Sequence, residues 1–279
     1  MVYVLNVQFP TSPEVKSLAA VILRRNISTS AIDSSDVKDV ANNANLWQRL
    51  SDENRNTVKQ QLIEVLRGSA EWPKHLTHKV CSLAVEIQGA MQEHENDAIW
   101  QDLIMLINEF ITTEQDKKVD TALQIFNGLF SYILDHLIKY KNELAMTLGK
   151  CLQHKSLDIK LAALQAVSNL LSTAERKDTK AFTELIPFMT KVIIDAMAES
   201  DEVVLEDALV EFNELAEIEP AFFKPYFVDI YNALKPVIAC QEFANSSIRQ
   251  QPLEFVVTLI ERKPSIAQKN IELLKDILE

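Results

Sequence analysis

Glycine is scarce in this chain, which has four glycines in 279 residues against an average of about 7%. Tight β-turns and the glycine-rich loops that cradle phosphates therefore have little to be built from. Proline is also sparse, at nine residues. The dominant residues are Leu, Ala, Ile, Val, Glu, Gln and Lys. This composition is typical of an all-helical protein.

The short motifs that mark common enzyme classes are missing as well. The chain has no Gly-x-Ser-x-Gly, no Gly-x-x-x-x-Gly-Lys-Ser/Thr, no Gly-x-Gly-x-x-Gly and no His-Glu-x-x-His. Nothing in the sequence selects a catalytic triad from the scattered Ser and His residues. We therefore expect a protein that binds other molecules, with no catalytic residues and no cofactor.

Cysteine is rare and its spacing is uninformative. The three cysteines, Cys81, Cys151 and Cys240, lie far apart in helical contexts, so we expect reduced, buried thiols of an intracellular protein. His75, His78 and Cys81 follow one another at i, i+3 and i+6, which could suggest zinc. No fourth ligand stands at a usual spacing, so helix packing explains these residues better than a metal site.

Positive charge is in short supply. The chain has 28 Lys and Arg residues against 40 Asp and Glu residues, a formal net charge of −12. Nucleic-acid surfaces need clustered Lys and Arg, so direct DNA or RNA binding is disfavoured, and basic partners are favoured instead. No apolar run approaches the roughly 18 residues of a membrane span, and the first residues lack the basic start of a secretory signal.

A unit of two helices recurs from about Ala70 to the C-terminus. Its mark is an apolar residue beside a basic or polar one, followed by a small residue and an apolar helix face. The marks are Lys79-Val80, Lys118-Val119, Ile159-Lys160, Val203-Val204 and Ile248-Arg249. Between Lys79, Lys118, Lys160, Val204 and Arg249 the spacings are 39, 42, 44 and 45 residues. HEAT and armadillo repeats have this period, so we expect an all-α, right-handed superhelix (solenoid) of HEAT-type helical pairs.

The pattern also predicts how the chain is organised. We expect a non-repeat N-terminal segment over 1–11, the second helix of a truncated repeat over 12–27 and a polar loop over 28–45. Residues 46–279 would form a single continuous solenoid of five helical pairs and one unpaired helix. The expected pairs are 51–67 with 73–91, 97–112 with 116–134, 136–153 with 156–173, 179–198 with 201–218, and 221–240 with 246–261, followed by helix 266–278.

Two details of this pattern carry further expectations. Pro187 lies within the expected helix 179–198, where proline removes a backbone hydrogen bond, so we expect a kink there. The apolar pattern continues to Leu278 without the polar outer face of a solenoid cap. We therefore expect this chain to be part of a longer array.

The three tryptophans could be exposed anchors or core residues. Trp100 continues the apolar face of Leu103 and Ile107, which favours the core. Neither Trp100 nor Trp47 nor Trp72 is followed by Asn four residues later, so the Trp-lined groove of armadillo importins is not expected.

Three segments carry a resemblance to a known family. Residues 16–25 read Lys-Ser-Leu-Ala-Ala-Val-Ile-Leu-Arg-Arg, residues 78–86 contain His-Lys-Val-Cys and Leu-Ala-Val-Glu, and residues 182–189 read Phe-Thr-Glu-Leu-Ile-Pro-Phe-Met. They resemble, in order, the Ala-Ala-Val-x-Leu-Arg-Arg helix, the second helix of the third repeat and the Leu-Leu-Pro segment of the sixth repeat of the importin-β (karyopherin-β) family. The resemblance covers residues 12–279, about the N-terminal third of such a receptor without its first repeat.

The resemblance implies a nuclear transport receptor that shuttles between cytoplasm and nucleus through the nuclear pore. In this family the inner, second helices bind Ran-GTP, the outer, first helices bind Phe-Gly repeats of nucleoporins, and basic protein cargo lies on the concave face. The missing first repeat counts against Ran binding here. The alternative is a structural HEAT scaffold such as a phosphatase regulatory subunit, whose repeats are more uniform in length.

An acid-rich helix expected over 201–218 is the best candidate for a binding site. At 100° per residue, Val204, Ala208, Phe212 and Leu215 share an apolar face, and acidic residues cover the opposite arc. Like charges at i and i+4 repel each other, so a basic partner would relieve the repulsion. The predicted partner-binding residues are Glu206, Asp207, Glu211, Asn213, Glu214 and Glu217. The alternative is a solvated face that only keeps the protein soluble.

Overall fold

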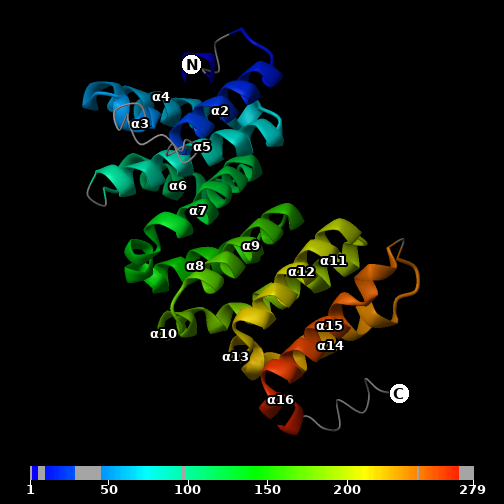
Figure 1. Ribbon diagram of the computed structural model, residues 1–279. Helices are drawn as coiled ribbons and strands as arrows, with labels where there is room; N and C mark the ends of the chain where they lie inside the picture. Colours follow the sequence, from blue (N-terminus) through cyan, green and yellow to red (C-terminus); the bar gives the residue numbers. More distant parts are fainter. Residues whose placement is uncertain (1, 6–9, 29–44, 96–97, 244, 270–279) are drawn as a thin grey trace, which may run out of the picture. The chain divides into compact units, whose positions relative to one another are not determined.

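The computed structural model describes residues 2–5, 10–28, 45–95, 98–243 and 245–269, and every regular element in these ranges is a helix (Figure 1). The chain divides into two compact units, Met1–Ile133 and Leu134–Glu279. Among the described helices, none combines the length and the apolar character that crossing a bilayer requires. The all-α prediction is confirmed.

In the first unit the second helices of the pairs pack on one another. We call the first helix of each pair A and the second B. The B helices are α2 (Pro13–Ser28), α5 (Lys74–His94) and α7 (Asp116–Leu137), and the A helices are α4 (Asp52–Gly68) and α6 (Gln101–Ile111). Short elements are α1 (Val2–Leu5), α3 (Leu46–Arg49) and the 3₁₀ helix η2 (Ser69–Glu71). Helix α2 packs along α5, and α4 contacts both α5 and α6.

Local sequence explains where these helices begin. Ser51 is the N-cap of α4, and its side chain accepts a hydrogen bond from the backbone N–H of Asn54 at 3.4 Å. Asn45 caps the short α3 in the same way, accepting from Gln48 at 2.9 Å. The next residue but one, Trp47, is fully buried and donates its indole N–H to Glu95 at 2.8 Å. This bond ties α3 to the end of α5.

The second unit consists of two layers of helices. The A layer contains α8 (Lys141–Leu152), α11 (Ile186–Glu199) and α14 (Phe227–Ala239), and the B layer contains α9 (Leu157–Thr173), α12 (Glu202–Ile218) and α15 (Gln251–Arg262). The short elements are η3 (Ile138–Tyr140), α10 (Arg176–Thr179), η4 (Lys180–Leu185), α13 (Pro220–Phe223), η5 (Lys224–Tyr226), η6 (Ser246–Arg249) and α16 (Pro264–Lys269). Each A helix contacts its own B helix, α12 packs between α9 and α15, and α11 contacts α8 and α14.

Aromatic side chains fill the core between the last pairs of this unit. The rings of Phe212, Phe223 and Phe255 lie with centroids 5.0 to 5.6 Å apart, and all three side chains are buried. Pairs at this spacing contribute about 0.5–1.5 kcal/mol beyond the area they bury. These contacts join α12, α13 and α15, and so hold in place the B helix α12, which carries the predicted acidic residues.

The predicted helices between residues 12 and 261 appear, some of them divided into shorter elements, but the expected kink at Pro187 is wrong. Pro187 is the second residue of α11, and the residues before it form α10 and the 3₁₀ helix η4. Proline is tolerated in the first turn because the missing N–H would have no partner there. The predicted helix 221–240 is likewise divided, into α13, η5 and α14.

The predictions for tryptophan and cysteine hold in part. Trp100 is buried, as expected. Cys81 and Cys151 are buried, free thiols, but Cys240, which follows the end of α14, is only half-buried. The prediction that all three thiols are buried is therefore wrong for Cys240, which is the C-cap residue of α14 and lies outside its buried face.

Parts of the predicted organisation fall outside the described residues. Residues 29–44, most of the predicted polar loop, and residues 270–279, most of the predicted last helix, are among them. Within the described residues, 2–5 form α1 and 264–269 form α16. The single continuous solenoid over 46–279 stays a prediction.

Candidate functional site

The acid-rich helix forms as α12, and its apolar face is buried. Asp201 is the N-cap and accepts a hydrogen bond from the backbone N–H of Val204 at 3.1 Å. Acidic residues in the first turn also suit the positive end of the helix dipole. The buried residues of α12 are Val204, Leu205, Ala208, Leu209, Phe212, Leu215 and Ala216. The six predicted site residues occupy the remaining arc.

Two of the six face the neighbouring B helix and its preceding segment. One Glu206 carboxylate oxygen accepts hydrogen bonds from the Asn245 side-chain amide and the Ser247 hydroxyl, both at 3.0 Å. The Asn213 amide donates to the backbone carbonyl of Gln251 at 3.3 Å and also contacts the side-chain oxygen of Gln251. Both residues therefore hold α12 to η6 and α15, and they are less available to a partner than the sequence suggested.

Glu211 lies on the other flank of α12, toward α9. It is half-buried and bonds with the side chain of Ser168. Burial raises the pKa of the Glu211 carboxyl, the Ser168 hydrogen bond opposes that rise, and the nearby Glu214 and Asp207 carboxylates add to it. In the described part of the chain, neither Lys nor Arg forms an ion pair with Glu211.

The other three predicted residues, Asp207, Glu214 and Glu217, are exposed. Together with Glu211 they form what we call the acidic row, along the solvent side of α12. Within the residues that the structure describes, no basic side chain pairs with any member of the row. Of the six predicted residues, then, four form one surface and two are occupied in packing.

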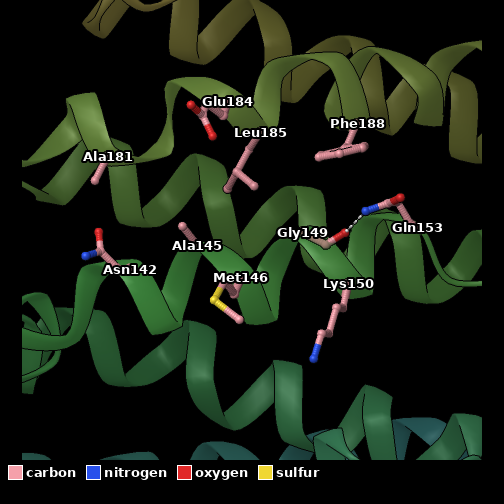
Figure 2. Close-up of a pocket in the computed structure, with 10 residues that line it drawn as sticks. All are labelled: Asn142, Ala145, Met146, Gly149, Lys150, Gln153, Ala181, Glu184, Leu185 and Phe188. Carbon is pink, nitrogen blue, oxygen red and sulfur yellow. Dashed lines mark hydrogen bonds between the residues drawn. The ribbon is translucent and has the colours of Figure 1, made fainter.

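A groove on the A layer was missed by the sequence prediction. It lies between α8 on one side and η4 with the start of α11 on the other, with a volume of about 410 Å³ (Figure 2). Its lining residues are Asn142, Ala145, Met146, Gly149, Lys150, Gln153, Ala181, Glu184, Leu185 and Phe188. Met146 is 64% exposed, so its apolar side chain can be reached by a ligand in the groove.

A glycine lies in the middle of the α8 side of the groove (Figure 2). Gly149 is buried, and a Cβ atom at this position would lie 3.2 Å from Cδ2 of Leu185 on the opposite wall. The Gln153 amide donates to the backbone carbonyl of Gly149 at 2.8 Å, the dashed line in Figure 2. With the small Ala145 and Ala181 on its walls, the groove has room for one flat apolar side chain. The sequence signal that could have indicated this groove is a glycine and a methionine one turn apart on a predicted A helix.

The His75, His78 and Cys81 group is not brought together. His78 hydrogen-bonds Asp120 of α7 at 2.8 Å, His75 is exposed, and Cys81 is buried with its sulfur 3.9 Å from the carbonyl of Thr121. Burial raises the pKa of the Cys81 thiol, which disfavours the thiolate that a metal needs. The described residues contain no group of three or more His, Cys, Asp or Glu side chains that could hold a metal ion.

Comparison with known proteins identifies related chains. The family model described as "IPO5-like, TPR repeats" matches residues 73–233. The probable importin-5 homolog of Dictyostelium discoideum is 21% identical over 232 residues, which cover 82% of this chain and 21% of that protein. TPR repeats are about 34 residues long, whereas the spacing here is that of HEAT-type pairs.

Solved structures of Kap121p share the fold. One crystal structure matches with a TM-score of 0.76 and 17% identity, covering 96% of this chain and 24% of Kap121p. Kap121p bound to Nup53p matches with a TM-score of 0.75, 17% identity and coverage of 97% and 24%. Kap121p bound to RanGTP matches with a TM-score of 0.75, 16% identity and coverage of 96% and 23%. The helical-pair solenoid class is thus confirmed, over about a quarter of the length of these relatives.

Proposed function

The chain belongs to the importin-5-like family of importin-β (karyopherin) proteins, and from this membership we propose that it acts as part of a nuclear transport receptor. The proposed partners are basic protein cargo, Phe-Gly repeats of nucleoporins and Ran-GTP. The receptor would shuttle between the cytoplasm and the nucleus. Its work is binding and release, without a catalytic step.

The observation that carries this proposal is that the two layers of the second unit differ in chemistry. The A layer has the mostly apolar groove between α8 and η4–α11, and the B layer has the acidic row on α12. A receptor that carries basic cargo past apolar repeats needs both kinds of surface at once. Kap121p, which shares the fold, has been crystallised with Nup53p and with RanGTP.

The groove suits a phenylalanine side chain. Met146, Leu185 and Phe188 supply apolar and aromatic contacts, and the polar Asn142 and Glu184 at the rim can bond the backbone of a bound peptide. An aromatic pair contributes about 0.5–1.5 kcal/mol, so one such site binds weakly. Weak sites act together on a repeated ligand, because the second contact forms at a high effective concentration.

The acidic row suits Lys and Arg side chains of a cargo. Its carboxylates have no basic partner in the described part of the chain, so a bound cation would relieve their mutual repulsion. Solvent-exposed charges attract over about 10 Å at moderate salt. We therefore expect cargo binding that weakens steeply as salt is added.

A labelled Phe-Gly repeat peptide tests the groove. Met146→Glu places a charge on the apolar wall and should weaken peptide binding at least fivefold, because burying the charge costs more than 1 kcal/mol. Met105→Glu is the matched control, since Met105 of α6 is 58% exposed and is not one of the residues that line the groove. Equal binding by the two variants, or equal binding of a peptide with Phe replaced by Ser, would remove the groove from the proposal.

A basic peptide tests the acidic row. The variant carries Asp207→Asn, Glu211→Gln, Glu214→Gln and Glu217→Gln. The control carries Glu143→Gln, Glu199→Gln, Asp229→Asn and Glu242→Gln, which removes the same charge from exposed positions outside the row. We expect only the first set to flatten the dependence of affinity on salt. If both sets lose the salt dependence of affinity to the same extent, the net charge of the protein, and not this row, attracts the peptide.

Ran-GTP is proposed to bind the B helices of the first unit. The exposed side of α2 carries Leu18 and Val21, which are apolar and accessible. Binding of Ran loaded with a non-hydrolysable GTP analogue, compared with GDP-loaded Ran, tests this part directly. Equal affinity for both nucleotide states would contradict it.

A further inference from the structure

We propose that the ion pair between Lys141 and Asp178 positions one wall of the A-layer groove and so sets the affinity of the groove for its ligand. This inference rests on the proposed function, in which the groove holds a Phe-Gly segment. Lys141 and Asp178 do not line the groove. They are positioning residues, which act through the wall that they hold.

The wall in question is a 3₁₀ helix. Between α10 and α11 the chain forms η4, and the backbone N–H of Ile186 bonds the carbonyl of Thr183. Hydrogen bonds of this i→i+3 type have poorer geometry than those of an α-helix, so a 3₁₀ segment is easier to deform. Phe182 and Leu185 are buried and anchor η4 from below, whereas Ala181 is half-buried and Glu184 is exposed. The part of η4 that faces solvent is therefore not held by core packing, and another contact is needed to hold it.

The middle of the groove is held by close packing (Figure 2). There Gly149 of α8 approaches Leu185 so closely that an added Cβ would leave only 3.2 Å to Cδ2. Close contact of this kind resists movement because the packed atoms have no free space. This contact therefore acts as a fixed point between α8 and η4.

One end of the groove is held by the ion pair. Figure 2 shows Asn142 and Ala181 across from each other at that end, on α8 and η4. Lys141 directly precedes Asn142, and Asp178 lies three residues before Ala181. The Lys141 Nζ is 2.8 Å from Asp178 Oδ1, with side chains 39% and 15% exposed. The pair thus ties the two walls together at the Asn142 and Ala181 end of the groove (Figure 2).

The expected size of the effect follows from this partial exposure. Ion pairs near the surface are worth at most about 1 kcal/mol, which corresponds to about a fivefold change in affinity. Salt screens such a pair. The affinity of an apolar peptide for the groove should therefore fall with added salt, although the peptide carries no charge.

An uncharged Phe-Gly peptide and the full chain test the proposal. Lys141→Ala and Asp178→Asn should each weaken binding about three- to fivefold and abolish its salt dependence. Lys141→Arg should stay within twofold of the original chain, and the exchanged pair Lys141→Asp with Asp178→Lys should recover most of the affinity. The control is Lys177→Ala, which breaks the Lys177–Glu175 pair at 2.6 Å, whose side chains are both 73% exposed and belong to the same segment.

The outcomes separate the two proposals. If the original chain does not bind the peptide, the proposed function of the groove fails. If the original chain binds but Lys141→Ala and Asp178→Asn bind like Lys177→Ala, the ion pair does not position the wall. Should either single variant lose its fold in thermal unfolding, the salt dependence of the original chain decides, because affinity that does not fall with salt overturns the inference.

Discussion

Gly89 of α5 lies against the ring of Tyr132 of α7, so closely that a Cβ atom at position 89 would be 2.6 Å from Cζ of the tyrosine. A second glycine makes the reciprocal contact: Gly128 of α7 lies against the side chain of Val85 on α5. Two of the four glycines in the chain thus lie at one interface between B helices. Because glycine is scarce in this chain, finding two glycines at one interface indicates that α5 and α7 need small residues there to approach each other closely.

The first prediction is that Gly89→Ala destabilises the protein even though alanine is the better helix former. Overpacking of a tight interface costs about 1–3 kcal/mol, and the very close approach of the Tyr132 ring places the cost above the gain in helix propensity of about 1 kcal/mol. In a Tyr132→Ala background the clash is gone, so the same change should become stabilising. Chemical denaturation of the four variants gives the sign in each background, and a sign that does not reverse would show that the ring is not the cause.

The second prediction concerns the buried pair of Lys160 on α9 and Asp195 on α11, whose Nζ and Oδ2 atoms are 2.5 Å apart. Asp195→Ala leaves the buried ammonium of Lys160 without its partner, so we expect a loss of about 3 kcal/mol in the free energy of unfolding. Lys160→Met with Asp195→Leu removes both charges and should recover most of that loss. Urea denaturation measures both, and a double variant no more stable than Asp195→Ala would point to packing in place of charge.

The third prediction is a pH dependence at Glu211. Because burial raises its pKa in the folded state above the usual value of 4.5, the folded protein binds the proton more tightly than the unfolded chain does. The destabilising contribution is therefore absent below about pH 4.5 and appears as pH rises through the folded pKa. Glu211→Gln should be the more stable protein at pH 7, and its advantage should shrink near pH 4. An advantage that is constant with pH would exclude this ionisation as its source.

The fourth prediction is that Cys240 reacts with thiol reagents before the other two cysteines. Burial raises the pKa of Cys151 to about 11, so about one thiol in a thousand is ionised at pH 8, and burial also raises the pKa of Cys81. Cys240 is half-buried and can be reached by reagent. Alkylation of the native protein followed by peptide mass spectrometry should find one modified cysteine, and Cys240→Ser should leave none that reacts at that rate.

The helical pairs were predictable because their signal is local. An apolar residue every third or fourth position defines each buried face, and residues such as Ser51 and Asp201 mark helix starts by capping the first turn. The kink at Pro187 was wrongly predicted because a proline removes one backbone hydrogen bond whether it lies inside a helix or in its first turn, and the sequence pattern does not distinguish the two cases. Here the buried Phe182 and Leu185 hold the preceding segment as a 3₁₀ helix.

The acidic helix shows how far the same reasoning reaches into the site. Periodicity correctly placed Asp207, Glu214 and Glu217 opposite the buried face of α12. It could not tell that Glu206 and Asn213 bond to η6 and α15, or that Glu211 turns toward Ser168 on α9. A single helix has two flanks, and only the packing of its neighbours decides which residues on those flanks are covered.

The amino-acid sequence by itself determined that this protein is all-helical, built from repeated pairs and acidic. Helix formation depends on the spacing of apolar residues within a few turns, and the net charge is a sum over the composition, so neither requires knowledge of tertiary contacts. Only the tertiary structure decided the groove. Its two walls are about forty residues apart in the chain, and they meet because Gly149 lets α8 approach Leu185 while Lys141 reaches Asp178. Contacts between distant residues depend on distances that no local pattern records, so the surface that a partner would touch becomes visible only when the layers are packed.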